Sequence, residues 1–132
     1  MRILTVIHPN TMYRGYQVTK IVSTDWNFRG TFFPTSTFKG LTDFSQEVVH
    51  LLGRVDGIAE LGLTKHEFSI GKADVFKWNE LEPQILQIIT ETAKRFWPDE
   101  EIEMVVHDER PAYLKYQKDN PDPDWDDYTF LD

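Results

Sequence analysis

Histidine is the residue in this chain best suited to bind a metal, because the sequence contains no cysteine. The four histidines are His8, His50, His66 and His107. No two of them stand four residues apart and no His-Glu-x-x-His pattern exists, so their spacing does not favour a metal site. His66 and Glu67 adjoin on a predicted strand, where neighbouring side chains point to opposite faces. We interpret the histidines as structural and predict no metal site.

Nucleophilic catalysis and phosphate binding also lack their usual patterns. There is no cysteine nucleophile and no Gly-x-Ser-x-Gly elbow. Gly53, Gly57 and Gly62 match neither of the common glycine-rich phosphate motifs, and the first two suit a helix end and a turn. We therefore predict that the chain is not an enzyme, has no catalytic residue and binds no cofactor.

The acidic residues are unevenly placed. The net charge is −8, but residues 1–98 carry a net +1 and residues 99–132 carry a net −9. Such asymmetry indicates an acidic extension, and the carboxylates of Asp99 to Glu109 read best as a solvated charge run. Because phosphate binding needs cations, this end is not suited to nucleic acid.

Hydrophobic periodicity predicts the elements that would position any site. Branched residues alternate at the start, and a Pro-Asn turn follows them. Further along, an amphipathic helix precedes a hairpin. The expected ranges are a strand over Arg2–Ile7, a returning strand within Met12–Val22, a strand over Phe28–Thr35, a helix capped by Thr42 or Asp43 and ending at Leu52, and hairpin strands over Ile58–Leu63 and Glu67–Ile70.

A second long helix follows the hairpin. It should begin between Asn79 and Pro83, with Asn79 or Glu82 as the cap, and Pro98 should end it. Beyond it we expect an added strand at Ile102–His107 and then a turn at Pro111. The predicted division of the chain is a domain over residues 1–98, an added strand and turn over 99–117, and a poorly ordered acidic tail over 118–132.

Several short motifs occur together in an order that is typical of one family. They are the Leu-x-x-Val-Asp-Gly-Ile turn (Leu52 to Ile58), Glu67-Phe68, Lys72, and Trp78 with Pro83 five residues later. The opening strand also runs into Pro9-Asn10-Thr11-Met12. Over about residues 1–93 the chain resembles the N-terminal domain of Nfu/NifU-type iron–sulfur scaffold proteins.

The resemblance implies both a fold and a function. The fold is α+β, a small antiparallel or mixed sheet with two helices packed on one face. The full-length family carries its cluster on a separate domain with a Cys-x-x-Cys pair, and this chain has no cysteine. The implied function is that of a non-catalytic accessory or protein-interaction module, connected to iron–sulfur cluster assembly or delivery.

Aromatic residues supply the candidate interaction sites, since they are enriched at protein interfaces. Trp97 stands just before Pro98, and Trp125, Tyr128 and Phe130 lie within the acidic tail. Two alternatives stay open. One is an acidic interaction or inhibitor protein acting through residues 99–132, and the other is a small ligand-binding protein or enzyme with a pocket near the aromatic loop 26–38.

The expected setting is cytoplasmic, with one or more protein partners that include iron–sulfur assembly machinery. No stretch approaches about 20 apolar residues, so no membrane span is predicted. The first seven residues are too short and too strand-like for a secretory signal.

Overall fold

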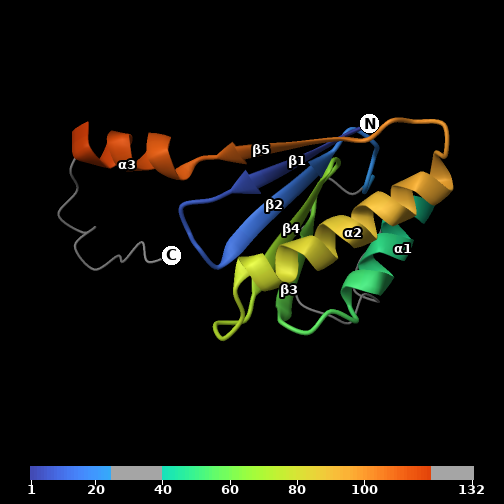
Figure 1. Cartoon of the computed structure of the whole chain (residues 1–132), viewed down its shortest axis with the longest axis horizontal. Coiled ribbons are helices and arrows are strands. Elements are labelled where there is room, and N and C mark those ends of the chain that lie inside the picture. The colour runs from blue at the N-terminus through green and yellow to red at the C-terminus, as the bar shows by residue number, and fades with distance from the viewer. Residues whose placement is uncertain (25–39, 120–132) are drawn as a thin grey trace.

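The computed structural model describes residues 1–24 and 40–119, with side chains up to Lys115. Figure 1 shows a sheet with two helices in front of it and a third helix set apart. In chain order the elements are β1 (Arg2–Ile7), β2 (Tyr13–Val18), α1 (Asp43–Leu52), β3 (Ile58–Leu63), β4 (Glu67–Lys72), α2 (Trp78–Phe96), β5 (Glu103–Asp108) and α3 (Arg110–Asp119).

The five strands form one mixed sheet in the order β3-β4-β2-β1-β5. β1 is antiparallel to β2 and parallel to β5, and the other pairs are antiparallel. α1 and α2 pack on one face of the sheet (Figure 1). The predicted α+β fold, with a mixed sheet and two helices on one face, is confirmed.

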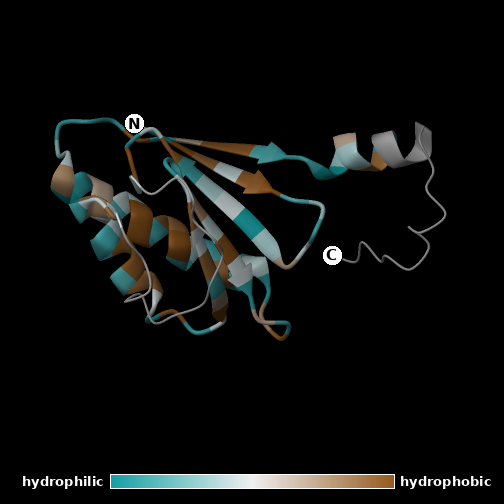
Figure 2. Cartoon of the chain, turned by 180° about the vertical axis from the view of Figure 1, so that it is seen from behind, coloured by the Kyte–Doolittle hydropathy of each residue, from teal (hydrophilic) through white to brown (hydrophobic). Residues whose placement is uncertain are grey.

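The core lies between that face and the two helices. Tyr16, Phe68 and Ile3 point inward from the strands and are fully buried. Phe44 on α1 stacks edge-on against Phe68, with ring centroids 6.2 Å apart. Figure 2, seen from behind, shows hydrophobic bands on the helices where they meet the sheet. Burial of these apolar side chains is the main force that holds the two layers together.

α1 begins and ends where its sequence pattern predicts. Of the two expected caps, Thr42 is the one used, since its side chain accepts a hydrogen bond from the Ser45 backbone N–H at 3.4 Å. The Ser45 hydroxyl is fully buried and donates to the Val22 carbonyl. The cap therefore also ties the start of α1 to the chain that follows β2.

Gly57 connects α1 to β3 and has a φ of +100°. Only glycine adopts that region without strain, so the turn predicted at Val55-Asp56-Gly57 is confirmed. A Cβ atom placed on Gly57 would lie 2.6 Å from Cγ of Phe76 and 2.9 Å from Cδ2 of Leu81. Backbone conformation and packing thus both require glycine here.

α2 begins at Trp78, before the predicted start, and neither Asn79 nor Glu82 is its cap. Lys77 takes the cap position without a side-chain hydrogen bond, and Pro83 lies inside the helix. Trp78 explains the difference, because its ring is only 8% exposed and its indole N–H donates to the Thr11 carbonyl at 2.7 Å. Tertiary packing, rather than a cap, sets this boundary.

The added strand predicted at residues 102–107 is confirmed as β5. The turn predicted at Pro111 is wrong, because Pro111 is the second residue of α3. Proline is tolerated there since the first N–H groups of a helix have no intrahelical acceptor. α3 extends past the end of β5, away from α1 and α2 (Figure 1).

The carboxyl group of Asp108 should titrate well below the usual aspartate range. Arg110 donates to it from Nε at 3.0 Å, from Nη2 at 2.9 Å and from its backbone N–H, and these bonds lower the pKa of Asp108 to about 2. A pKa below the unfolded value of 3.8 contributes stability that is present above about pH 4 and lost as the pH falls toward 2. Carbon NMR should show a midpoint of about 2, moving toward 3.8 in Arg110→Gln. A wild-type midpoint already at 3.8 would contradict the pairing.

The strand predicted over residues 28–35, the aromatic loop 26–38 and most of the acidic tail lie outside the described residues. Lys118 and Asp119 are the last residues of α3. Within the described part of the chain, no helix is long and apolar enough to cross a membrane. The predicted domain boundaries stay predictions.

Candidate functional site

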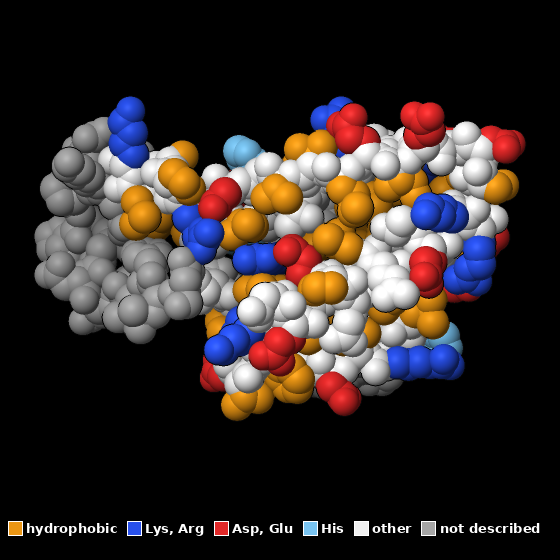
Figure 3. Space-filling view, in the orientation of Figure 1, with side chains coloured by type: hydrophobic (Ala, Val, Ile, Leu, Met, Phe, Trp, Pro, Cys, Tyr) orange, Lys and Arg blue, Asp and Glu red, His pale blue; other side chains and the backbone are white. Residues whose placement is uncertain are grey.

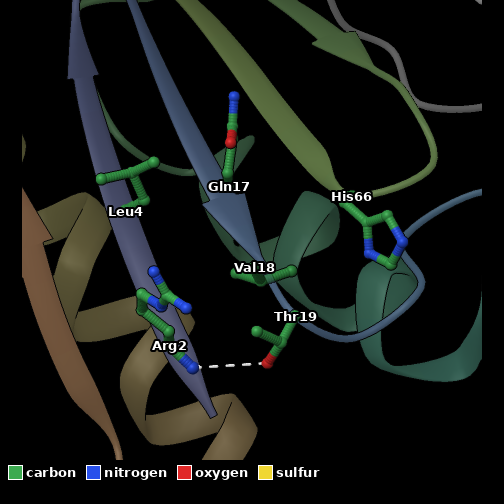
Figure 4. Close-up of a pocket in the computed structure, with 6 residues that line it drawn as sticks. All are labelled: Arg2, Leu4, Gln17, Val18, Thr19 and His66. Atoms are coloured by element: carbon green, nitrogen blue, oxygen red, sulfur yellow. Dashed lines mark hydrogen bonds between the residues drawn. The ribbon is translucent and has the colours of Figure 1, made fainter. Parts of the chain in front are cut away.

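The face of the sheet opposite the helices carries an open hollow of about 400 Å³. Arg2 and Leu4 alternate with the buried Ile3 on β1 and therefore point away from the helices. Figure 4 shows these side chains with the neighbouring groups from β2 and the β3–β4 turn. The lining residues are Arg2, Leu4, Gln17, Val18, Thr19 and His66.

Strand register brings this set together. Ile3 pairs with Val18, which places Arg2 beside Thr19, and the Arg2 backbone N–H lies 3.3 Å from the Thr19 hydroxyl oxygen (Figure 4). Nδ1 of His66 lies 3.0 Å from the carbonyl oxygen of Lys20, which holds the imidazole at the rim. The hollow thus offers a half-buried leucine surrounded by a guanidinium, an amide, a hydroxyl and an imidazole.

A second hollow of about 520 Å³ adjoins the first and shares Arg2 and Thr19 with it. Its other lining residues are Met1 and the mainly acidic residues 100–103, which lead into β5. Lys20 contacts Glu100 there, with Nζ and Oε2 2.5 Å apart, and this hydrogen bond lowers the pKa of the Glu100 carboxyl. The lining therefore changes from basic and neutral at Arg2 to acidic at residues 100–103.

Trp97, a predicted interaction residue, is half-buried and packs against the core. Its ring lies 5.0 Å from that of Phe44 and 5.8 Å from that of Phe96, and Nζ of Lys20 lies 4.6 Å above it. Much of its surface is therefore used within the fold. The other three candidates, Trp125, Tyr128 and Phe130, lie outside the described residues.

Sequence reasoning missed a partly buried polar cluster at the N-terminal end of α2. Oε2 of Glu82 lies 3.0 Å from Nη1 of Arg14, and the Tyr16 hydroxyl donates to Oε1 at 3.1 Å. The Arg14 guanidinium also lies 5.2 Å over the Trp78 ring. Burial and the adjacent Glu82 carboxylate raise the pKa of Tyr16.

One sequence signal points to this cluster. Arg14, Tyr16 and Val18 alternate along β2, so Arg14 takes a position that faces the helices. A cation on an inward face requires an acceptor from the covering layer. The alternation along β2 thus predicts that Arg14 needs an acceptor, but it does not identify Glu82 as that acceptor. Among the described residues Nε of Arg14 has no hydrogen-bond acceptor.

Two of the histidines contact charged side chains close by. Nδ1 of His8 lies 3.2 Å from a Glu109 carboxylate oxygen, and Nε2 of His50 lies 3.0 Å from the Arg54 guanidinium. Within residues 1–24 and 40–119, no three histidine, cysteine or acidic side chains gather where they could hold a metal ion.

Comparison with known proteins yields similarity only at the level of structure. No protein-family model matches the chain, and no curated protein matches it in sequence. The solution structure of a NifU-like protein from Saccharomyces cerevisiae superposes with a TM-score of 0.51 at 16% identity, covering 67% of this chain and 75% of that one. The chain has a NifU-like fold.

Two staphylococcal structures were also matched. The crystal structure of protein SAV1430 from Staphylococcus aureus gives a TM-score of 0.49 at 11% identity, covering 67% of this chain and 98% of that one. The solution structure of SeR13 from Staphylococcus epidermidis gives 0.43 at 22% identity, covering 67% and 93%.

Proposed function

We propose that this chain is a non-catalytic protein-interaction module that serves iron–sulfur cluster assembly or delivery in the cytoplasm. The observation that carries the proposal is the NifU-like fold, found over two thirds of the chain. The ordered motifs between Leu52 and Pro83 support it, because they resemble the N-terminal domain of Nfu/NifU-type scaffolds.

The chemistry of cluster ligands indicates which domain would hold the iron–sulfur cluster. Iron–sulfur clusters are held mainly by cysteine thiolates, and this chain has no cysteine. In the proposal a Cys-x-x-Cys domain distinct from this module carries the cluster. This module contributes surface complementarity to that partner, so it needs no reactive side chain.

The hollow around Leu4 is the surface we assign to the partner. A half-buried apolar side chain with polar groups at its rim has the arrangement of a small protein interface. Arg2, two residues before Leu4 on β1, and Gln17, its cross-strand partner on β2, are both exposed. The acidic hollow beside it would extend the contact to a basic part of the partner.

Binding to a purified NifU-type Cys-x-x-Cys domain tests the proposal. We expect saturable binding by calorimetry, weakened about tenfold by Arg2→Glu because the substitution inverts a charge at the rim. Lys94→Glu is the matched control, since Lys94 is exposed on α2 and the change in net charge is the same. It should leave the affinity unchanged.

Two results would count against the proposal. If the wild-type chain does not bind the Cys-x-x-Cys domain in either its apo or its cluster-loaded form, the assigned partner is wrong. If Arg2→Glu and Lys94→Glu weaken binding equally, the effect is one of net charge and the assigned surface is wrong. Circular dichroism of each variant confirms that the fold is intact.

A further inference from the structure

β5 is the outer strand of the sheet, and its hydrogen-bonding pattern is fixed by its pairing with β1. The Glu103 N–H donates to the Met1 carbonyl and the Glu109 N–H donates to the Ile7 carbonyl, both at 2.9 Å. Backbone groups alternate in direction along a strand, so odd-numbered residues of β5 face β1. The N–H and C=O groups of Met104 and Val106 therefore face the outer edge, where the described chain supplies no further strand.

The outer edge is also apolar on the side that bears the helices. Met104 pairs with Ile3 and Val106 with Thr5, so their side chains lie on the helix side, yet they are 60% and 66% exposed. Figure 3 shows apolar side chains exposed along the part of this face where β5 and β1 run. An exposed apolar edge with unpaired backbone groups favours the addition of another strand.

We propose that β5 pairs with β5 of a second copy of this chain, antiparallel, about a twofold axis through Val105. In this register Met104 lies opposite the partner copy's Val106 in hydrogen-bonded pairs, which use the outward backbone groups. Glu103 lies opposite His107 of the other copy. Because of the twofold symmetry, this contact between a carboxylate and an imidazole occurs twice in the dimer. Every side chain of the strand centre then faces a complementary one.

Neighbouring registers lose this complementarity. Two residues that lie opposite each other must point to the same face of the sheet and must both turn their backbone groups either toward or away from the partner strand. The twofold axis can therefore pass only through a residue, and it shifts by whole residues along the strand. An axis at Val106 would place Met104 opposite Asp108, and an axis at Met104 would place Glu103 opposite Val105. Both leave a carboxylate against one of the three central apolar residues, Met104, Val105 and Val106. The axis at Val105 places none there, and Asp108 then lies opposite Ile102 only at the two ends of the paired segment.

The pairing joins two five-stranded sheets into one continuous sheet with all of its covering helices on the same side. It is isologous, as is usual for dimers with twofold symmetry. It removes the exposed edge at β5 from both copies and covers Met104 and Val106. The inference rests on the backbone edge and the apolar residues of β5 and not on the hollow around Leu4, although Glu103 also lines the acidic hollow.

Disulfide capture tests the axis directly, since the chain has no cysteine of its own. Facing Val105 residues would form a non-hydrogen-bonded pair with Cα atoms about 4.5 Å apart, which a disulfide can span. Under mild oxidation Val105→Cys should form a covalent dimer at least about tenfold faster than Val75→Cys, a control that is 86% exposed on a distant loop. Met104→Cys should be slow as well, because it faces position 106 of the other copy.

A charge exchange tests the register without cysteine. Glu103→Lys and His107→Glu should each raise the dimer dissociation constant about tenfold in sedimentation equilibrium. The double variant restores an attractive pair and should return to within about threefold of wild type. Recovery in the double variant is specific to contact between two copies of this chain.

Several outcomes would overturn the proposal. One is a wild-type monomer at all concentrations with Val105→Cys no faster than Val75→Cys. Another is a dimer that both single charge variants leave unchanged, since that dimer uses another surface. A third is a monomer whose Val105→Cys variant is captured only after residues 120–132 are deleted, because the chain's own tail would then occupy the edge.

Discussion

Replacing Gly57 with valine should lower the free energy of unfolding by about 3 kcal/mol or more. The φ of +100° costs a β-branched residue about 1–3 kcal/mol of strain. Its Cβ would also lie 2.6 Å from the Phe76 ring, and overpacking of this kind adds about 1–3 kcal/mol. Urea unfolding followed by tryptophan fluorescence measures the loss.

Gly53→Ala is the matched control, because Gly53 lies in the same connection with an ordinary helical φ of −62°. Alanine adopts that conformation without strain, so stability should hold or rise by up to about 1 kcal/mol. Equal losses in the two variants would show that the positive φ of Gly57 is not what sets the cost.

Replacing Glu82 with alanine should cost about 2 kcal/mol, less than in a fully buried ion pair because the Glu82 side chain is 24% exposed. It leaves the Arg14 cation without its carboxylate while its side chain is only 15% exposed, and it removes the acceptor of the buried Tyr16 hydroxyl. Removing one member of a buried ion pair is more damaging than removing both, because a lone charge stays desolvated. Thermal and urea unfolding should both report the loss.

Two further variants separate that mechanism from a general loss of packing. The double variant Arg14→Met with Glu82→Leu removes both charges and should recover more than half of the stability lost in Glu82→Ala. Glu47→Ala breaks the exposed ion pair with Arg95 and should cost less than about 1 kcal/mol. A double variant as unstable as Glu82→Ala would contradict the desolvation argument.

The parts of the fold that sequence predicted well are those with a local pattern. β1, α1 and the β3–β4 hairpin have clear alternation or helical periodicity between turn residues. The start of α2 was wrong because the signal there, the contact of Trp78 with the Thr11 carbonyl, joins residues 67 positions apart. α3 was missed because Pro111 is equally compatible with a turn and with the first turn of a helix.

The candidate site depends on register, and no local pattern encodes register between distant strands. Arg2 and Thr19 meet because β1 and β2 pair at Ile3 and Val18, while His66 reaches Lys20 only through the hairpin. The aromatic residues expected to bind a partner were chosen by composition. The one that the structure describes, Trp97, is half-buried and packs against the core.

The two neighbours of β1 have very different consequences for the order of folding. β2 follows it after a short turn, but β5 pairs with it from about 100 residues further along the chain. Closing a long loop costs more entropy than closing a short one, and non-local pairing slows folding. β5 should therefore dock late, after a four-stranded intermediate has formed. In that intermediate the outer edge of β1 has no neighbouring strand. At high protein concentration this edge, in addition to the edge of β3, could pair with another chain before β5 covers it.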